Sequence, residues 1–216
     1  MKACIRLLFA LIPLLLVACG EPDRPSISLY LALQRGDLDQ IERHLYWGTD
    51  INAPDPQGRR PLHVAAERGS VVVTRLLLKH GAAVDATDAA GRTPLDRAVL
   101  AGRTQVADLL LQHGATMDAN TLLLEAARHD SQDRDVVRWL VGHGADLEHR
   151  DDSGDTALLI AVRRGNHRLA RHLVDQGADV NVRDAQGHSA LGIAGELGYT
   201  EIVSLLRRYG AADGGT

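Results

Sequence analysis

The stretch Gly58-Arg-Arg-Pro-Leu-His-Val-Ala-Ala-Glu-Arg-Gly69, closed by Leu76-Leu-Leu-Lys-His-Gly81-Ala82, is a unit that the chain repeats. It returns as Gly91-Arg-Thr-Pro-Leu-Asp-Arg-Ala-Val-Leu-Ala-Gly102, closed by Leu109-Leu-Leu-Gln-His-Gly114-Ala115, and the step from Gly58 to Gly91 defines the period. A second run has the same period, because glycines 154, 165 and 177 recur at 187, 198 and 210. A fixed period of this length indicates stacked repeats, each of which buries its apolar face against its neighbours.

The segments Arg60-Pro-Leu-His-Val-Ala65 and Thr93-Pro-Leu-Asp-Arg-Ala98, together with the period, resemble the T-P-L-H-x-A core of the ankyrin repeat. The resemblance covers nearly everything after residue 27. It implies an all-α solenoid of about six stacked helix-turn-helix repeats with short β-turn fingers, here over residues 27–213, with 214–216 frayed. The expected repeats are 27–53, 54–86, 87–119, 120–149, 150–182 and 183–213.

The fourth unit departs from the period. The step from Thr93 to Thr121 is shorter than the step from Gly58 to Gly91, so we expect the finger of this unit to be missing or truncated. Its two helices are preserved, and Trp139 is expected to pack within the rebuilt unit. The polar loop 129–135 between them is either solvated or a place for specific binding.

Residues 1–18 are expected to be a leader outside the fold. Lys2 and Arg6 give a positive start, and the apolar run 7–17 contains only Pro13 as an interruption. This run is too short for a membrane-spanning helix, which needs about 20 residues, and it suits a secretory signal peptide. The alternative is a buried core helix, which the proline and the missing polar face oppose.

Leu16-Val-Ala-Cys19 resembles the lipobox of bacterial lipoproteins. The resemblance implies cleavage before Cys19 and acylation of that cysteine, and several acyl chains anchor a protein stably. Gly20 stands where an inner-membrane retention signal has Asp, which favours the periplasmic face of the bacterial outer membrane. Residues 19–26 would then be the lipidated cysteine and a short tether. The alternatives are a soluble periplasmic protein cleaved elsewhere, or Cys19 as a metal ligand or nucleophile.

The two cysteines fit an oxidising compartment. Cys4 would leave with the leader and Cys19 would carry lipid, so the repeats would contain no thiol and form no disulfide.

The charge argues against nucleic acid as a partner. The chain has 24 basic and 28 acidic residues, a formal charge of −4. Loss of Lys2 and Arg6 with the leader, which contains no acidic residue, would make the remaining chain more acidic still. A phosphate backbone requires the opposite sign.

The sequence offers no catalytic constellation, cofactor motif or metal site. His80, His113 and His143 precede the closing glycines of successive units, but stacked helices lie about 10 Å apart, so these residues cannot share a zinc ion. His63 looks like the structural histidine of the family, which bonds the backbone between repeats. One enzymatic alternative remains, a hydrolase that uses His129, Asp130 and Asp133 in the loop of unit four.

The resemblance implies binding through the fingertips and the exposed concave face of the first helices. The corresponding residues are Gln57, Arg59, Glu67, Arg68, Arg92, Leu100, Ala101, Arg128, His129, Asp152, Asp155, Arg163, Arg164, His188, Glu196 and Leu197. Among them Arg68, Arg128, Arg163 and Arg164 form either a cationic stripe for a partner or a set of solvated charges. Tyr46 and Trp47 are large aromatics at an expected exposed edge, where they suit a binding hot spot.

These observations predict a non-enzymatic, monomeric binding module, tethered to the membrane by lipid, that holds a periplasmic protein. The partner could be an envelope enzyme, a stress-defence protein or an incoming toxin, in which case the chain is an immunity protein. A purely structural envelope lipoprotein is the competing hypothesis.

Overall fold

The computed structural model describes residues 21–129 and 134–212. Over these residues the chain forms twelve α-helices and two isolated β-bridges, Arg150 with Thr156 and Arg183 with Ser189. The helices are α1 (Leu29–Arg35), α2 (Leu38–Tyr46), α3 (Pro61–Arg68), α4 (Val71–Lys79), α5 (Pro94–Leu100), α6 (Thr104–Gln112), α7 (Ala119–Arg128), α8 (Arg134–Gly142), α9 (Ala157–Arg163), α10 (His167–Asp175), α11 (Ala190–Glu196) and α12 (Thr200–Arg208). The predicted all-α repeat fold is confirmed.

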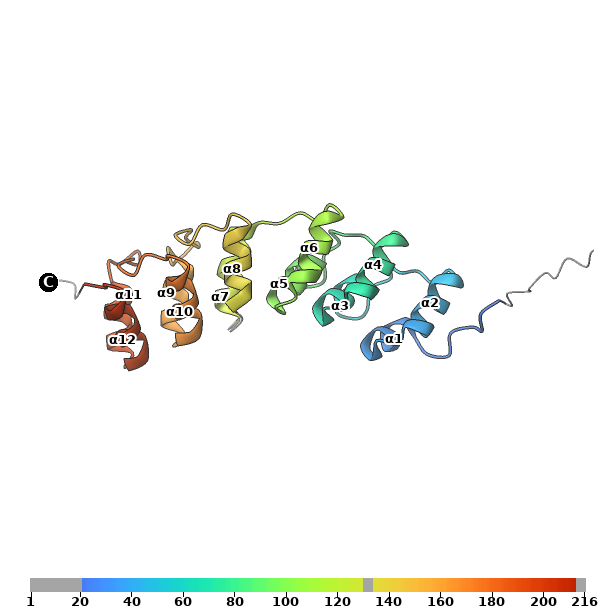
Figure 1. Ribbon diagram of the computed structural model, residues 1–216, viewed down its shortest axis with the longest axis horizontal. Coiled ribbons are helices and arrows are strands. Elements are labelled where there is room, and N and C mark those ends of the chain that lie inside the picture. The colour runs from blue at the N-terminus through green and yellow to red at the C-terminus, as the bar shows by residue number, and fades with distance from the viewer. Residues whose placement is uncertain (1–20, 130–133, 213–216) are drawn as a thin grey trace, which may run out of the picture.

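The helices stand as pairs in a gently curved row, from α1 and α2 at one end to α11 and α12 at the other (Figure 1). The odd-numbered helices are the first helices of the units, and each packs against the first helices next to it in the row. In the pairs other than α7 and α8, the two helices meet in a tight turn at one edge of the row, while the connections between units run along the opposite edge (Figure 1).

The core is one layer of side chains between successive pairs. A leucine recurs at one position of every first helix and is buried in all of them: Leu29, Leu62, Leu95, Leu123, Leu158 and Leu191. Small residues such as Ala66 and Ala98, both 0% exposed, let the helices approach closely. Because each unit buries this layer only against its neighbours, stability is close to a sum of unit and interface contributions.

Polar ties between successive units fix their spacing. In the loop after the second helix of units one, two, four and five, and at the start of α7, a side chain accepts a backbone N–H of the next such loop along the row at 2.7 to 3.0 Å. The pairs are Asn52 with Ala83, Asp85 with Thr116, Asn120 with Asp146, Glu148 with Asp179, and Asn181 with Ala212. The tie persists through unit four, where Asn120 supplies the oxygen.

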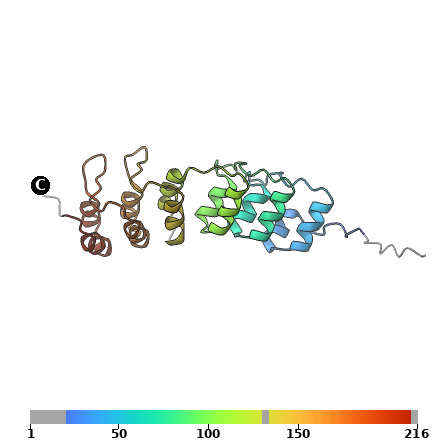
Figure 2. The same cartoon turned by 45° about the horizontal axis from the view of Figure 1, so that its top comes forward.

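Unit four has no finger, as its short spacing predicts. The chain passes directly from Met117 into α7, and the Asp118 side chain caps this helix by accepting the N–H groups of Asn120 and Thr121. Tall loops precede α9 and α11 in Figure 2, and no such loop precedes α7.

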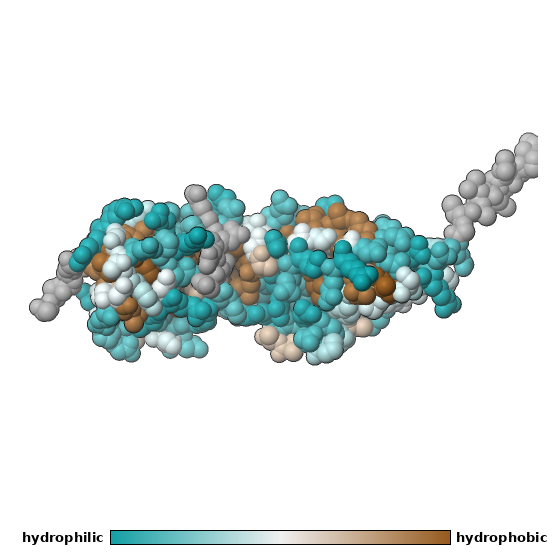
Figure 3. Space-filling model, turned by 90° about the horizontal axis from the view of Figure 1, so that it is seen from below, coloured by the Kyte–Doolittle hydropathy of each residue, from teal (hydrophilic) through white to brown (hydrophobic). Residues whose placement is uncertain are grey.

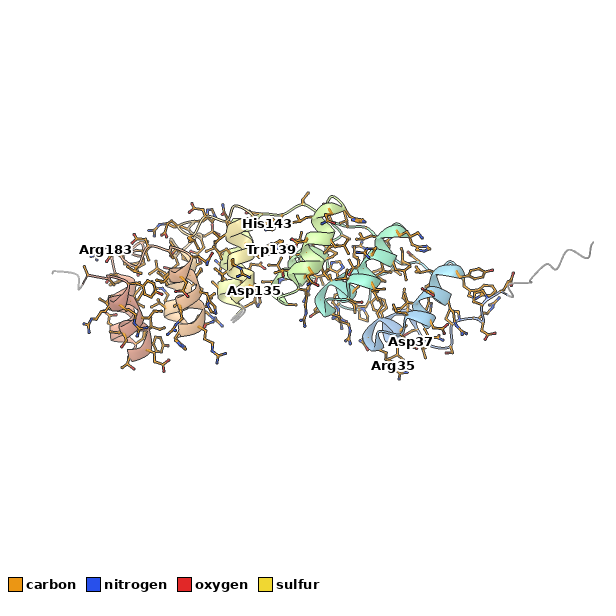
Figure 4. The ribbon with its side chains drawn as sticks, in the orientation of Figure 1. Arg35, Asp37, Asp135, Trp139, His143 and Arg183 are labelled. Atoms are coloured by element: carbon orange, nitrogen blue, oxygen red, sulfur yellow. The ribbon has the colours of Figure 1, made fainter. Side chains whose placement is uncertain are left out.

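Trp139, which was expected to pack within unit four, also contacts unit three. Its Nε1 donates to Asp108 Oδ1 of α6 at 2.7 Å, and its ring lies 4.0 Å from the ring of His143. Figure 4 shows both labelled side chains on α8, the helix that follows α6 along the row.

Candidate protein-binding surface

The exposed end of each first helix differs from unit to unit, whereas the buried positions repeat. At equivalent places just before or at the turn into the second helix, the units carry Arg35, Arg68, Ala101, His129, Arg164 and Leu197, which we call the helix-end row. All but Ala101 are exposed, and Leu197 is an apolar side chain with 50% of its surface accessible. Figure 3 views this edge of the molecule, which is largely hydrophilic with separate hydrophobic patches. Packing does not dictate these residue types.

Two of the four arginines in the expected stripe hold fingers in place. Arg128 pairs with Asp151 of the unit-five finger at 2.7 Å, and Arg163 pairs with Asp155 at 2.9 Å. Arg163 also reaches Asp184 of the next finger at 2.6 Å. These guanidinium groups are therefore already neutralised by carboxylates of the protein itself.

Arg68 and Arg164 are different. Both are exposed, and neither forms an ion pair with another residue in the described parts of the chain. They belong to the helix-end row, as does the exposed Arg35, and they lie at α3 and beside α9. The stripe expected from the sequence is thus reduced to two available arginines.

The candidates in units two and three form a connected polar group. Arg59 pairs with Asp55 at 2.8 Å and lies 3.6 Å from Glu67, while Arg92 lies 3.6 Å from Glu125. The side chain of Arg92 also contacts His129 Nε2. Gln57 is an exposed fingertip residue whose carbonyl oxygen accepts the N–H of Ala89.

Buried aspartates inside the fingers organise the candidates in units five and six. Asp184 accepts the backbone N–H groups of Gln186 and His188 and lies 3.1 Å from His188 Nδ1. Burial by itself would raise the pKa of Asp184, but hydrogen bonds from His188 and Arg163 outweigh it and hold the pKa at about 2. His188 and Asp152 remain exposed on these fingers.

Sequence reasoning did not identify these finger aspartates as the organising groups. An aspartate stands three residues before the finger glycine in four units, at Asp55, Asp88, Asp151 and Asp184, so the signal was present in the spacing. Asp88 shows the same role, because its carboxylate accepts the N–H groups of Ala90 and Arg92 and pairs with Arg97 at 2.5 Å.

The aromatic edge is occupied by the chain's own N-terminal segment. Trp47 Nε1 donates to the carbonyl oxygen of Pro22 at 3.1 Å, and the guanidinium of Arg24 lies 4.9 Å above the Trp47 ring. Tyr46 packs edge-on against Trp47, with 56% of its surface accessible. Trp47 thus binds residues that the sequence suggested were part of a tether, and Tyr46 is the aromatic that remains open.

His63 is a structural residue. Its ring is fully buried, Nδ1 accepts the N–H of Arg60 at 3.1 Å, and Nε2 lies 3.0 Å from the carbonyl oxygen of Arg92 in the next unit. Since a backbone N–H can only donate, the proton resides on Nε2 and the ring is neutral. Burial lowers the pKa of His63, which keeps it neutral.

Within residues 21–129 and 134–212, no group of three or more His, Cys, Asp or Glu side chains is arranged to hold a metal ion. The helices of the same residues are too short and too polar for any of them to cross a bilayer. Asp130 and Asp133, two of the three residues of the hydrolase hypothesis, lie outside the described residues, as does Cys19.

The structure is a repeat scaffold: equivalent buried positions carry the same residue types in successive units, whereas equivalent exposed positions carry different ones. Residues 29–121 and 123–214 match the family model of ankyrin repeats in three copies, so the chain belongs to the ankyrin repeat family. Ankyrin repeats are protein–protein interaction modules, and the relatives are typically non-enzymatic. No curated protein sequence matches the chain significantly.

Many solved structures are similar to it, and three of them illustrate the range. One is a chain in the complex of the Bd0816 predatory endopeptidase from Bdellovibrio bacteriovorus with the immunity protein Bd3460. It is 25% identical to this chain with a TM-score of 0.67, and the match covers 86% of this chain and 99% of that one. Another is an ankyrin repeat domain (ABAYE2397) from Acinetobacter baumannii AYE, with 31% identity, a TM-score of 0.64, and coverage of 85% and 98%. The human ASB11 ankyrin repeat domain shares the fold at 24% identity and a TM-score of 0.71, over 86% of this chain and 85% of that chain.

Proposed function

We propose that this chain binds a protein partner in the bacterial envelope through the face formed by its fingers and first helices. The observation that carries the proposal is the helix-end row. Equivalent buried positions repeat leucine, whereas equivalent exposed positions hold arginine, histidine, alanine and leucine. Packing fixes the residue type at the buried positions and leaves this row free to hold side chains that suit a partner.

Within this face, Arg68 and Arg164 are the two arginines of the expected stripe that the protein's own carboxylates leave available. Arginine binds carboxylates in a bidentate manner and is enriched in protein interfaces. The proposed partner therefore presents acidic groups opposite these two arginines. Leu197 adds an apolar contact at the C-terminal end of the row.

The proposal includes a lipid anchor at Cys19, on the periplasmic face of the outer membrane. It rests on the leader and the lipobox-like Leu16-Val-Ala-Cys19. Growth with radiolabelled palmitate tests it, with Cys19→Ser as the control. Label in the wild-type chain and none in the variant is the expected result, and an unlabelled wild-type chain contradicts the anchor.

A second candidate is more specific, namely that the chain is an immunity protein that neutralises a hydrolytic enzyme. The observation in its favour is the similarity to a chain in the complex between a predatory endopeptidase and its immunity protein. Titration of the purified chain into assays of envelope endopeptidases from the producing bacterium tests this candidate. Stoichiometric inhibition supports it, and full activity of each enzyme at saturating chain contradicts it.

The binding face is tested by charge reversal. Affinity capture from envelope extracts compares the wild-type chain with Arg68→Glu/Arg164→Glu and with a matched control, Arg75→Glu/Arg171→Glu, which reverses two exposed arginines on second helices. We expect the partner with the wild type and the control, and loss of at least about tenfold with the first variant, since a buried charge pair costs about 2 kcal/mol or more to break. Equal capture of the partner by all three chains contradicts the proposed binding face.

A further inference from the structure

The finger that unit four lacks can be identified residue by residue. One period earlier in the chain, Asp118, Ala119 and Asn120 correspond to residues 85–87, whereas Thr121 corresponds to Thr93. The missing residues are therefore the counterparts of 88–92, the turn of the unit-three finger. The residues on either side of this turn are retained, and Asn120 accepts the N–H of Asp146 in the loop after α8.

A hollow of about 460 Å³ lies beside the place where this turn would stand. One wall is the unit-three finger and its helix start, with Ala90, Arg92 and Asp96, and the other wall is the entry into α7, with Thr116, Asp118 and Glu125. The hollow is as large as an ordinary small ligand site. It is open on the finger side, because nothing in the described chain replaces the missing turn there.

The fingers of units two and three bond through their backbones. The Gln57 carbonyl oxygen in unit two accepts the N–H of Ala89 in unit three at 3.1 Å. The fingers approach so closely that a Cβ on Gly58 would lie 2.7 Å from the Ala89 nitrogen. Ala90 is the counterpart of Gln57 in unit three, and among the described residues no backbone N–H donates to its carbonyl oxygen. The exposed edge of the unit-three finger thus retains an acceptor suited to another turn.

The hollow is acidic. Asp96, Asp118 and Glu125 line it together with a single cation, Arg92. Both aspartates already cap helices, Asp96 by accepting the N–H of Thr93 and Asp118 by accepting that of Thr121. They are fixed in place, and the balance of two negative charges favours a cationic occupant.

We propose that this hollow is the docking site for a β-turn loop of the protein partner, a loop that carries Lys or Arg and takes the place of the missing finger. The loop donates a backbone N–H to the Ala90 carbonyl oxygen and directs its cation toward Asp118 and Glu125. This inference rests on the proposed function, because it names a second contact on the same partner-binding face. It assigns a role to the irregular unit that the regular ones cannot have.

The first test uses a defined probe, a disulfide-closed β-hairpin peptide with Lys on each side of an Asn-Gly turn, and the same peptide with Glu in place of Lys. Each is titrated into the ¹⁵N-labelled chain at low salt. We expect the Lys peptide to shift the amide resonances of Ala90, Gly91 and Thr116 to Thr121 and the Glu peptide to leave them unchanged. Shifts that are equal for both peptides, or that spread over the other fingers, overturn the proposal.

Charge-neutral variants test the chemistry without a change of shape. Asp96→Asn/Asp118→Asn/Glu125→Gln keeps an oxygen at each helix cap. We expect it to lower the affinity for the Lys peptide about fivefold or more, because each lost charge removes about 0.3 kcal/mol or more of binding free energy. The matched control, Glu42→Gln/Asp50→Asn/Asp179→Asn, removes three exposed charges elsewhere and should bind as the wild type does. An equal loss of affinity for the Lys peptide in both variants means that the peptide responds only to the net charge of the chain, and this overturns the proposal.

A finger-restoring variant tests the shape. Insertion of Asp-Ala-Ala-Gly-Arg, the sequence of residues 88–92, between Asn120 and Thr121 makes the step from Thr93 to Thr121 equal to the step from Gly58 to Gly91. We expect loss of the peptide-induced shifts at Ala90, with the amide spectrum of units one and two unchanged. Retained binding to a correctly folded insertion variant overturns the proposal, and if the variant misfolds the charge-neutral series decides.

The two proposals fail separately. If the captured partner depends on Arg68 and Arg164 but binds the charge-neutral variant with wild-type affinity, the hollow is not its docking site while the binding face stands. If capture is insensitive to every charge change, the binding face itself is wrong.

Discussion

His63 is expected to couple units two and three, and the substitution His63→Asn tests this directly. The asparagine oxygen can still accept the N–H of Arg60, as the carboxylate of Asp96 accepts the N–H of Thr93 at the same place in unit three. The shorter side chain cannot reach the carbonyl oxygen of Arg92. The variant thus removes the link between units and keeps the link within the unit.

The expected loss follows from the contacts. The hydrogen bond from Nε2 to the Arg92 oxygen has a net worth of about 1 kcal/mol. That oxygen also accepts the N–H of Asp88 at 3.0 Å, so it is not left unpaired and no further polar penalty arises. The lost ring atoms leave a small cavity in a fully buried site, which costs about another 1 kcal/mol. The total loss of stability is about 2 kcal/mol.

The pH dependence has a definite sign. Burial lowers the folded-state pKa of His63 below its usual 6.5, so the unfolded chain binds this proton more readily than the folded one. The stability that the neutral ring contributes is present above pH 6.5 and is lost as the pH falls through the folded pKa. The advantage of the wild type over His63→Asn should therefore shrink from about pH 7.5 to about pH 5.5.

Urea unfolding followed by circular dichroism measures both effects, with Asp96→Asn as the matched control. That substitution keeps an acceptor for Thr93 and is expected to change stability by less than about 0.5 kcal/mol. Amide exchange should localise the loss to units two and three, because neighbouring units contribute separately. A loss for His63→Asn no larger than that of the control, or an advantage of the wild type that grows at lower pH, refutes the reasoning.

Three further outcomes are expected. Trp139→Phe keeps the packing between units three and four but removes the N–H group that donates to Asp108 at 2.7 Å. Urea titration should show that the free energy of unfolding falls by about 1 to 2 kcal/mol. An unchanged midpoint means that the bond does not stabilise the fold. Trp47→Ala removes the bond to Pro22, so hydrogen exchange at the amides of Asp23 and Arg24 should become faster while overall stability changes little. Unchanged exchange at these two amides contradicts the contact. Asp184→Asn should lower the free energy of unfolding by about 1 kcal/mol at neutral pH. The difference from the wild type should vanish as the pH falls through about 2, because the carboxylate loses its charge there and with it the stabilising bonds. A difference that persists in acid contradicts this assignment.

The binding residues were harder to predict than the fold because their environment depends on neighbours far along the chain. Position alone made Arg128, Arg163 and Arg164 appear equivalent at the ends of first helices. Arg163 pairs with Asp184 in the finger of unit six, and Arg128 pairs with Asp151 in the finger of unit five, so only Arg164 remains available among them. The distance between such groups is set by the stacking of the units.

The sequence by itself determined the repeat period, the six-unit all-α solenoid and the missing finger of unit four. These follow from counting residues, since a unit of fixed length folds in the same way wherever it recurs. Tertiary structure alone decided which charges are neutralised, that Trp47 binds the segment before α1, and that the missing turn leaves an acidic hollow. Each of these depends on how far one unit lies from the next, and side-chain contacts between units are governed by that spacing and not by the order of residues within a unit.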